Sequence, residues 1–165
     1  METAVSKKQT AGKYLTFRFD REEYGIEILR VCEIIGMMDV TRVPHTADYI
    51  LGVINLRGKV IPVINLRRKF GLPDVEVTNL TCIIVIDVHH VQIGIVVDEV
   101  SEVIDIHSEE IENAPEFGSA LDTSIIQGIG KVKERVIILL EIEKVLQWNR
   151  EELDTEVLTA IPNSI

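Results

Sequence analysis

The chain has 165 residues, of which 46% are apolar, and it carries a net charge of −10 at pH 7. This length and composition suffice to bury the core of one domain, or of two very small ones, and exclude a chain that is disordered as a whole. Residues 1–79 contain 12 basic and 10 acidic side chains, whereas residues 80–165 contain 5 and 17. Phosphate backbones and anionic lipid surfaces would repel such a chain, so the charge argues against nucleic acid or membrane ligands and leaves protein partners.

The first residues, 1–12, do not have the pattern of an export signal. Lys7 and Lys8 are followed by no apolar run, and no stretch reaches the roughly 18 apolar residues that a membrane helix needs. We therefore expect a protein that is neither exported nor inserted into a membrane, with flexible tails at residues 1–12 and 149–165. Cys32 and Cys82 lie in apolar runs, which favours two small, buried, reduced side chains; a disulfide between them is the alternative.

Alternation of apolar and polar residues predicts that the chain begins with two strands, at residues 15–19 and 24–28, joined by a hairpin at 20–23. Further along, β-branched and nearly continuous apolar runs predict strands buried on both faces, at residues 60–66, 82–88, 91–97 and 136–142. Turns are expected at Arg57-Gly58, His89-His90 and Glu134-Arg135. Helical signal is short and sparse, at residues 46–49, 67–70, 108–111 with Ser108 as N-cap, and 143–148.

An internal repeat organises these elements. Residues 25–35 align without gaps on 94–104, and residues 52–66 align on 128–142. Glycines coincide in the two copies, as do Glu33 with Glu102 and Arg57 with Lys133; chance matching of short apolar strands is the alternative. Two copies of a five-stranded unit of about 70 residues follow, each small enough to close its sheet into a barrel that removes exposed edges.

Signs of catalysis are weak. The four histidines, His45, His89, His90 and His107, all fall in predicted joints, and the chain has no G-x-S-x-G elbow, no P-loop and no G-x-G-x-x-G. His89 and His90 are adjacent, so on a strand they point in opposite directions and make a poor metal site. Carboxylates are spread over polar faces, where solubility explains them. We expect a binding protein without catalytic residues, metal or cofactor.

A few residues are out of place for a pure core. Arg57 follows an apolar strand, and Gly58 permits a tight turn there, so the guanidinium either clamps a carboxylate or carbonyl or is simply solvated. Glu33 lies in an apolar segment with Val31, Ile34 and Ile35. These residues either form a binding surface or simply pack into the core. Phe117, in a polar loop, is an interface anchor or a plug over a barrel mouth.

The chain resembles the CheW family of chemotaxis adaptors over about residues 13–147. The resemblance is carried by residues 23–34, by residues 50–66 with the specific run Gly-Val-Ile-Asn-Leu-Arg-Gly followed by Ile-Pro-Val, by residues 94–98 with Val100, and by residues 115–117. It implies an all-β fold of two SH3-like five-stranded barrels packed on a shared hydrophobic core with a few short helices. The barrels would cover about residues 14–79 and 80–147 of a single domain.

The same resemblance implies a non-enzymatic adaptor that couples chemoreceptors to the histidine kinase CheA in the cytoplasm. The apolar tip of a receptor's helical hairpin would lie in a groove between the barrels, at or near Val31, Glu33, Ile34, Gly52, Arg57, Val100 and Val103. The C-terminal regulatory domain of the kinase would contact Val40, Val43, Glu116 and Phe117. The protein would be a monomer alone and would join receptor arrays through protein contacts, not by membrane insertion.

Two rival functions make different demands on the structure. A small enzyme that uses clustered carboxylates such as Asp98 and Glu99 requires a pocket with converging acids. A generic SH3-like module for proline-rich peptides would line its groove with aromatic residues, and this chain has only 5% aromatics. A generic SH3-like protein-binding module of another two-component pathway is the alternative that stays open.

Overall fold

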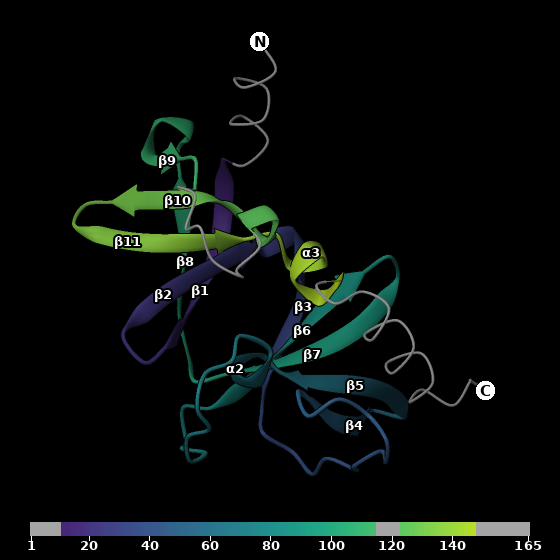
Figure 1. Ribbon diagram of the computed structural model, residues 1–165. Helices are drawn as coiled ribbons and strands as arrows, with labels where there is room; N and C mark the ends of the chain where they lie inside the picture. The colour runs from purple at the N-terminus through teal and green to yellow at the C-terminus, as the bar shows by residue number, and fades with distance from the viewer. Residues whose placement is uncertain (1–10, 115–122, 148–165) are drawn as a thin grey trace. The chain divides into compact units, whose positions relative to one another are not determined.

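A computed structural model describes residues 11–114 and 123–147 of the chain (Figure 1). These residues form two compact units, which we describe separately. Of the described residues, unit 1 combines those up to Leu29 with those between Val100 and Val145, and unit 2 combines Arg30–Glu99 with Leu146 and Gln147. Strands dominate both units, so the predicted all-β class is confirmed.

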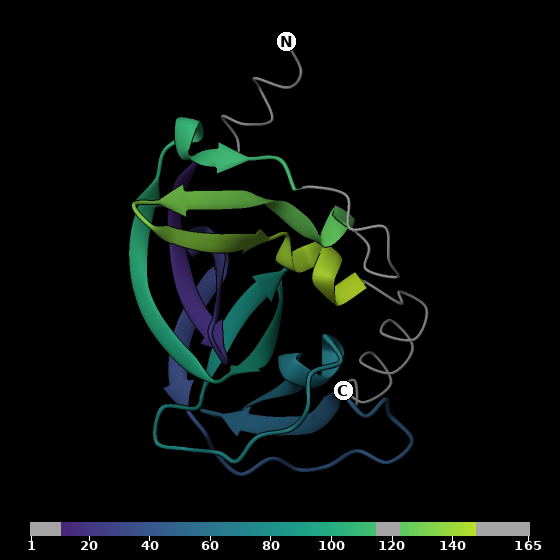
Figure 2. The same cartoon turned by 60° about the vertical axis from the view of Figure 1, so that its left-hand side comes forward.

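Unit 1 is built on a six-stranded sheet with the order β8-β1-β2-β11-β10-β9. Its strands are β1 (Gly12–Phe19), β2 (Glu22–Glu27), β8 (Glu99–Ile106), β9 (Ile111–Glu112), β10 (Ile126–Val132) and β11 (Arg135–Leu140). The long, curved β8 runs beside β1, as Figure 2 shows. Short 3-10 turns at Ser108–Glu110 and Thr123–Ile125 and the helix α3 (Ile142–Gln147) follow strands of this sheet.

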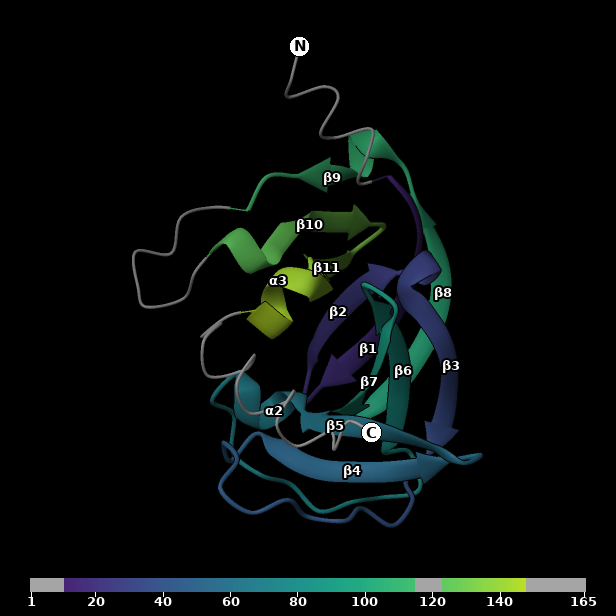
Figure 3. The same cartoon turned by 90° about the vertical axis from the view of Figure 1, so that its right-hand side faces the viewer.

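Unit 2 is built on a five-stranded sheet with the order β3-β6-β7-β5-β4. Its strands are β3 (Val31–Gly36), β4 (Ile50–Leu56), β5 (Lys59–Asn65), β6 (Cys82–Val88) and β7 (Val91–Val97). The short helix α2 (Leu66–Lys69) follows β5 directly, and the Asn65 side chain caps it by accepting from the Arg68 amide. Figure 3 shows β4 and β5 side by side at one end of this sheet. The SH3-like description fits both units, although unit 1 has a sixth strand, the two-residue β9.

The two sequence repeats exchange strands. In unit 1, β2 pairs in parallel with β11, so that Gly25 lies opposite Leu139. In unit 2, β7 pairs in parallel with β5, so that Gly94 lies opposite Val63. Gly25 and Gly94 are matched positions of the repeat, as are Val63 and Leu139, so each sheet combines the first hairpin of one repeat with the second hairpin of the other.

This exchange corrects the predicted barrel boundaries. Residues 14–79 and 80–147 are the two repeats in sequence, but neither makes up one unit. Through the parallel pairings, β1 and β2 join the sheet that contains the last hairpin of the chain, and β6 and β7 join the sheet that contains the β4–β5 hairpin. Repeat patterns reveal which segments are equivalent, whereas strand pairing depends on long-range contacts that a pattern does not contain.

Each unit buries its own apolar cluster. In unit 1 the cluster is formed by Tyr14, Ile106, Ile111, Ile137 and Leu139. In unit 2 it is formed by Ile54, Leu56, Ile61, Val63, Ile83, Val85 and Val96. The matched glycines lie where strands approach closely: a Cβ on Gly94 would lie 2.8 Å from the Ile83 side chain, and one on Gly25 would lie 3.2 Å from the Leu139 side chain. A core shared between the two barrels stays a prediction.

Several local predictions are confirmed and others are wrong. The strands at 82–88 and 91–97 have the predicted bounds, and α2 and α3 begin within one residue of the expected helices. Residues 46–49 form no helix and only 48 and 49 lie in a turn, and His107 instead of Ser108 caps the turn at 108–110. Neither cysteine forms a disulfide, but Cys32 is exposed on the edge strand β3 and Cys82 is half-buried, so the expected burial is wrong. In the part of the chain that the structure describes, no helix is long and apolar enough to cross a membrane.

Candidate functional site

The hairpin between β4 and β5 presents an arginine at its tip. Arg57 and Gly58 both have positive φ, 53° and 85°, the backbone that a tight two-residue hairpin turn requires. The Asn55 side chain fixes this turn by accepting a hydrogen bond of 2.7 Å from the Gly58 amide. The predicted turn at Arg57-Gly58 is therefore confirmed, and it carries the Arg57 side chain, which is 69% exposed, out of the sheet.

Arg57 is not a freely solvated side chain, because its guanidinium forms an ion pair with the Glu33 carboxylate. Glu33 lies on β3, so the pair links the hairpin tip to the strand at the far edge of the same sheet. Beside this link, Gln92 on β7 accepts from Lys59 at 3.3 Å and donates to the Cys32 sulfur at 3.5 Å. Of the alternatives that the sequence left open, the carboxylate clamp is the one found, with the carboxylate supplied by the chain itself.

Apolar residues neighbour Glu33 along β3. Ile34, the next residue on β3, is 44% exposed, and Val31 at the start of the strand is half-buried. A large aliphatic side chain on a solvent-facing strand is an expected component of a protein-binding surface. Of the seven predicted receptor-binding residues, Val31, Glu33, Ile34, Gly52 and Arg57 lie in unit 2, and the structure brings Glu33 and Arg57 into contact.

Gly52 has a structural task in β4. Its φ is +144°, and a Cβ there would lie 2.7 Å from the Thr41 carbonyl carbon and closer still to the carbonyl oxygen. Thr41 pairs with Val53 through two backbone hydrogen bonds of 2.8 and 2.9 Å, which draw the segment before β4 against this strand. Gly52 is therefore needed so that the two backbones can approach this closely.

The remaining two receptor-binding candidates, Val100 and Val103, lie on β8 in unit 1. Val100 is half-buried and Val103 is 48% exposed. Between them, Glu102 exchanges hydrogen bonds with the Thr16 hydroxyl through its backbone, at 2.9 and 3.2 Å, while its carboxylate accepts from Arg135 at 2.7 Å. Val103 therefore stands beside an ion-paired glutamate, as Ile34 does in unit 2.

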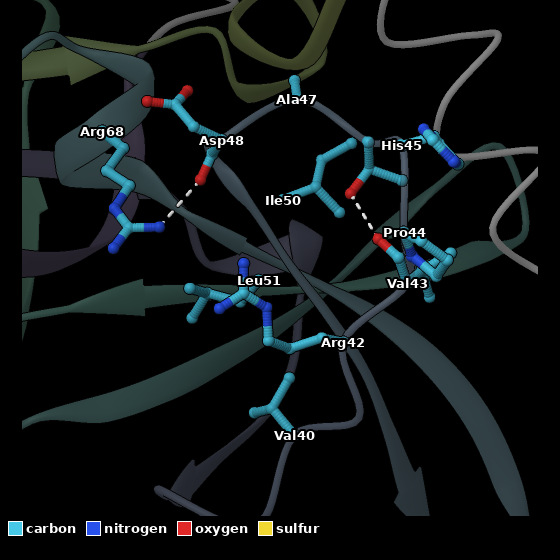
Figure 4. A pocket seen from close by; sticks show the side chains of 11 residues that line it. Val40, Arg42, Val43, Pro44, His45, Ala47, Asp48, Ile50, Leu51 and Arg68 are labelled. Atoms are coloured by element: carbon cyan, nitrogen blue, oxygen red, sulfur yellow. Dashed lines mark hydrogen bonds between the residues drawn. The ribbon is translucent and has the colours of Figure 1, made fainter.

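A hollow of about 660 Å³ lies in unit 2 between the loop before β4, β4 itself and α2 (Figure 4). Its lining includes Val40 and Val43, two of the predicted kinase-binding residues, together with Leu51 and Arg68. Figure 4 shows Arg68 at one end of the hollow and His45 at the other. The other two kinase-binding candidates, Glu116 and Phe117, lie outside the described residues, as do the predicted tails.

Arg68 is fixed at the edge of this hollow by two contacts. Its Nε and one Nη donate to the Asp74 carboxylate, each at 3.0 Å, and the other Nη donates to the Asp48 carbonyl at 2.9 Å. The hydrogen bonds from Arg68 hold the pKa of Asp74 below its usual 3.8. Because the pKa of Asp74 is lower in the folded protein than in the unfolded chain, the Arg68–Asp74 pair stabilises the fold fully at a pH above the pKa of Asp74 in the unfolded chain. This stabilisation is lost as the pH falls through the pKa of Asp74 in the folded protein.

We expect the pKa of Asp74, measured by carboxyl NMR titration, to lie below that of a free aspartate and to rise in the Arg68→Gln variant, because the guanidinium that favours the charged form is then gone. Asp105 provides the control, since it pairs with Lys13 and has no contact with Arg68. An Asp74 midpoint that Arg68→Gln leaves unchanged would contradict this assignment.

Asp98, one of the carboxylates of the rival enzyme, is ion-paired with an arginine. It accepts from the buried Arg67 guanidinium at 2.7 Å, and Arg67 also donates to the Pro73 carbonyl at 2.7 Å. Arg67 on α2 and Asp98 after β7 thereby tie the loop at residue 73 to the sheet. Among the described residues, no group of three or more His, Cys, Asp or Glu side chains is arranged to hold a metal ion.

The Asp98→Ala variant should lower the free energy of unfolding by about 2 kcal/mol, because it removes a hydrogen-bonded charge partner from a buried guanidinium. Asp105→Ala breaks an exposed ion pair of 3.0 Å with Lys13 and should cost less than about 1 kcal/mol. Urea unfolding of both variants measures the difference, and equal losses would refute a structural role for the Arg67–Asp98 pair.

Sequence reasoning missed one polar cluster, in unit 1. Arg135 donates to both carboxylate oxygens of the buried Glu23, at 3.1 and 2.6 Å, and also to Glu102. These partners stabilise the charged guanidinium and raise the pKa of Arg135. Because Glu23 belongs to the first hairpin and Arg135 to the last, only the parallel pairing of β2 with β11 brings them together, and no local signal in the sequence indicates it.

An ion-paired hairpin tip, exposed aliphatic side chains and a hollow beside a loop define the class of the protein: a small β scaffold whose surfaces suit protein partners. The family model described as CheW-like domain matches residues 13–150, and the chain belongs to the CheW-like family.

Relatives of this chain match its sequence over most of their own length. The chemotaxis protein CheW of Klebsiella aerogenes is 45% identical over 139 residues, which cover 84% of this chain and 84% of the relative. The chemotaxis protein CheW of Bacillus subtilis is 41% identical over 139 residues, covering 84% and 88%. The crystal structure of the scaffolding protein TtCheW from Thermoanaerobacter tengcongensis matches with a TM-score of 0.77 and 34% identity, covering 87% of this chain and 97% of that one.

Proposed function

We propose that the protein is a non-enzymatic adaptor that couples chemoreceptors to the histidine kinase CheA. The observation that carries the proposal is the Arg57–Glu33 pair at the exposed tip of the β4–β5 hairpin. The exposed Ile34 follows Glu33 on β3, so this edge strand offers both a charged and an aliphatic side chain, which suits a helix that presents an apolar face with polar flanks. Family membership and the names of the relatives support the same role.

In this proposal the apolar tip of a receptor's helical hairpin contacts Val31, Glu33, Ile34, Gly52, Arg57, Val100 and Val103. The C-terminal regulatory domain of the kinase contacts the surface around Val40 and Val43, together with Glu116 and Phe117. Each contact fixes the geometry of the kinase relative to the receptor, so that a shift of the receptor biases the kinase between active and inactive states. The protein acts in the cytoplasm, as a monomer alone and as a component of receptor arrays when bound.

The test is co-purification of the full chain with the host's chemotaxis kinase and a receptor cytoplasmic fragment, with kinase ATP turnover measured with and without the chain. A ternary complex and turnover that depends on the receptor only when the chain is present are the expected results. A folded chain that binds neither protein would refute the proposal and would mean that the scaffold serves a different, unidentified partner.

A further inference from the structure

The loop that lines the hollow of unit 2 is held in place by several contacts. Thr41 and Val53 pair through backbone hydrogen bonds of 2.8 and 2.9 Å, and the Thr46 hydroxyl donates to the Val43 carbonyl at 2.9 Å. His45 keeps a left-handed backbone within this loop, with a φ of 65°. The volume of about 660 Å³ lies in the range of pockets that bind ligands, roughly 300–1,000 Å³, so the hollow has room for several side chains of a partner.

The hollow combines an apolar lining with an available cation (Figure 4). Its apolar lining residues are Val40, Val43, Pro44, Ala47, Ile50 and Leu51. Arg68 is already bound to the Asp74 carboxylate and lies beside Asp48. Arg42 is exposed, and within residues 11–114 and 123–147 its side chain forms no hydrogen bond or ion pair. The hollow therefore suits a partner that brings an aliphatic side chain and a carboxylate together.

Residues 148–165, which we call the C-terminal segment, have this chemistry in their sequence. They carry one basic and four acidic side chains, a net charge of −3, and Val157 and Leu158 follow directly after the last acid, Glu156. In an extended segment, residues two positions apart share one face, so Glu156 and Leu158 can meet Arg42 and the apolar lining together. Residues 1–10 carry two basic side chains and one acidic side chain, and their net charge of +1 does not complement Arg42.

The C-terminal segment is attached close enough to reach the hollow. Leu146 and Gln147, which precede it, belong to unit 2, as do all the residues that line the hollow. The nine residues before position 157 span up to roughly 30 Å at about 3.3 Å per residue, about the diameter of a folded unit of this size. Because the tether keeps the segment at an effective concentration on the order of 1 mM, even a contact with a dissociation constant of about 0.1 mM would fill the hollow in about nine of ten molecules.

We propose that the C-terminal segment binds in the hollow of its own chain, with Leu158 on the apolar lining and Glu156 paired with Arg42. The bound segment covers Val40 and Val43 and thereby controls the access of the kinase to that surface, a second step that rests on the proposed function. The kinase binds there only after the segment leaves, so its apparent affinity is reduced in proportion to the fraction of molecules whose hollow is open. The chain thus carries an intramolecular competitor for one of its own partners.

Methyl NMR of the full chain tests the docking. Nuclear Overhauser effects should connect the Leu158 methyl groups with those of Val43 and Leu51, and they should not change with protein concentration. Effects that vanish on dilution would assign the segment to a second copy and overturn the intramolecular proposal. Leu158→Ser should shift the methyl signals of the hollow, whereas Val5→Ser, a similar change in the first residues of the chain, should leave them in place. Identical signals in the two variants would refute the docking.

Charge reversal tests the ion pair. Arg42→Glu and Glu156→Arg should each abolish the Overhauser effects between Leu158 and Leu51, because two like charges then meet. The double variant should restore them, since the pair forms again with the opposite polarity. Arg21→Glu, the same charge change at an exposed arginine of unit 1, is the matched control and should leave them unchanged. A double variant that does not regain the effects would show that these two residues are not partners.

Kinase binding separates this proposal from the proposed function. The Leu158→Ser variant should bind the kinase about tenfold more tightly than the unaltered chain in calorimetry, because its hollow stays open. Equal affinities would refute the control of access, and the NMR result would still decide the docking. If neither the unaltered chain nor the variant binds the kinase, the proposed function fails, and the docking depends on the NMR result alone.

Discussion

Replacement of Gly52 by alanine should lower the free energy of unfolding by about 4 kcal/mol or more, since the new methyl group would overlap the Thr41 carbonyl and the residue would have to keep a φ that only glycine adopts at low cost. The two backbone hydrogen bonds between Thr41 and Val53 hold the strands at this distance, so relief of the overlap requires that they break. Urea unfolding monitored by circular dichroism gives the loss directly.

Gly36 is the control for this variant. A Cβ on Gly36 would meet no atom within 4 Å, and its φ is not positive, so Gly36→Ala should change the free energy of unfolding by less than about 1 kcal/mol. Equal stability of the two variants would refute the close approach at Gly52. The expected result also gives Gly52 a structural role besides its place in the proposed receptor contact: substitutions there would impair binding by disturbing the loop before β4.

Replacement of Arg57 by glutamate should abolish coupling of the kinase to the receptor and leave the fold intact. The Arg57 side chain is 69% exposed, so the loss of its pair with Glu33 should change the free energy of unfolding by less than about 1 kcal/mol. Receptor affinity should fall by about tenfold or more, because the hairpin tip then presents a negative charge to the proposed receptor contact in place of a positive one. Calorimetry with a receptor fragment and kinase turnover in the ternary complex measure the two effects.

A charge swap distinguishes a partner contact from an internal brace. The double variant Glu33→Arg with Arg57→Glu restores an ion pair between β3 and the hairpin tip with the opposite polarity. If Arg57 serves the partner, coupling stays lost in the double variant although stability returns; if Arg57 only braces the hairpin against β3, the swap restores both. Unchanged kinase control in the single variant would refute any role of the guanidinium in coupling.

Much of the local structure follows from the sequence because it depends on neighbours in the chain. Continuous β-branched runs determined β6 and β7, the Arg57-Gly58 pair determined the β4–β5 turn, and the repeat identified Gly25 with Gly94 and Glu33 with Glu102. The helix predicted at residues 46–49 does not form, because Thr41 and Val53 draw the segment before β4 against this strand, and a tertiary contact of that kind overrides local propensity.

Part of the candidate site also follows from the sequence. An arginine at a turn that glycine permits and a glutamate in an apolar strand are visible as unusual residues, and the structure brings these two together. Arg135 with Glu23 is different, because each residue is ordinary in its own segment and the pair exists only through the parallel pairing of the first and last hairpins.

The sequence by itself thus determined the strands, the turns, the repeat and the residues with unusual chemistry, since periodicity and turn propensity act over a few positions. Only the tertiary structure decided which hairpins share a sheet, that the repeats exchange strands, and that Arg57 pairs with Glu33 whereas Arg135 pairs with both Glu23 and Glu102. The physical reason is that strand order is selected by the burial of apolar faces between segments distant in the chain, a collective effect that no local pattern records.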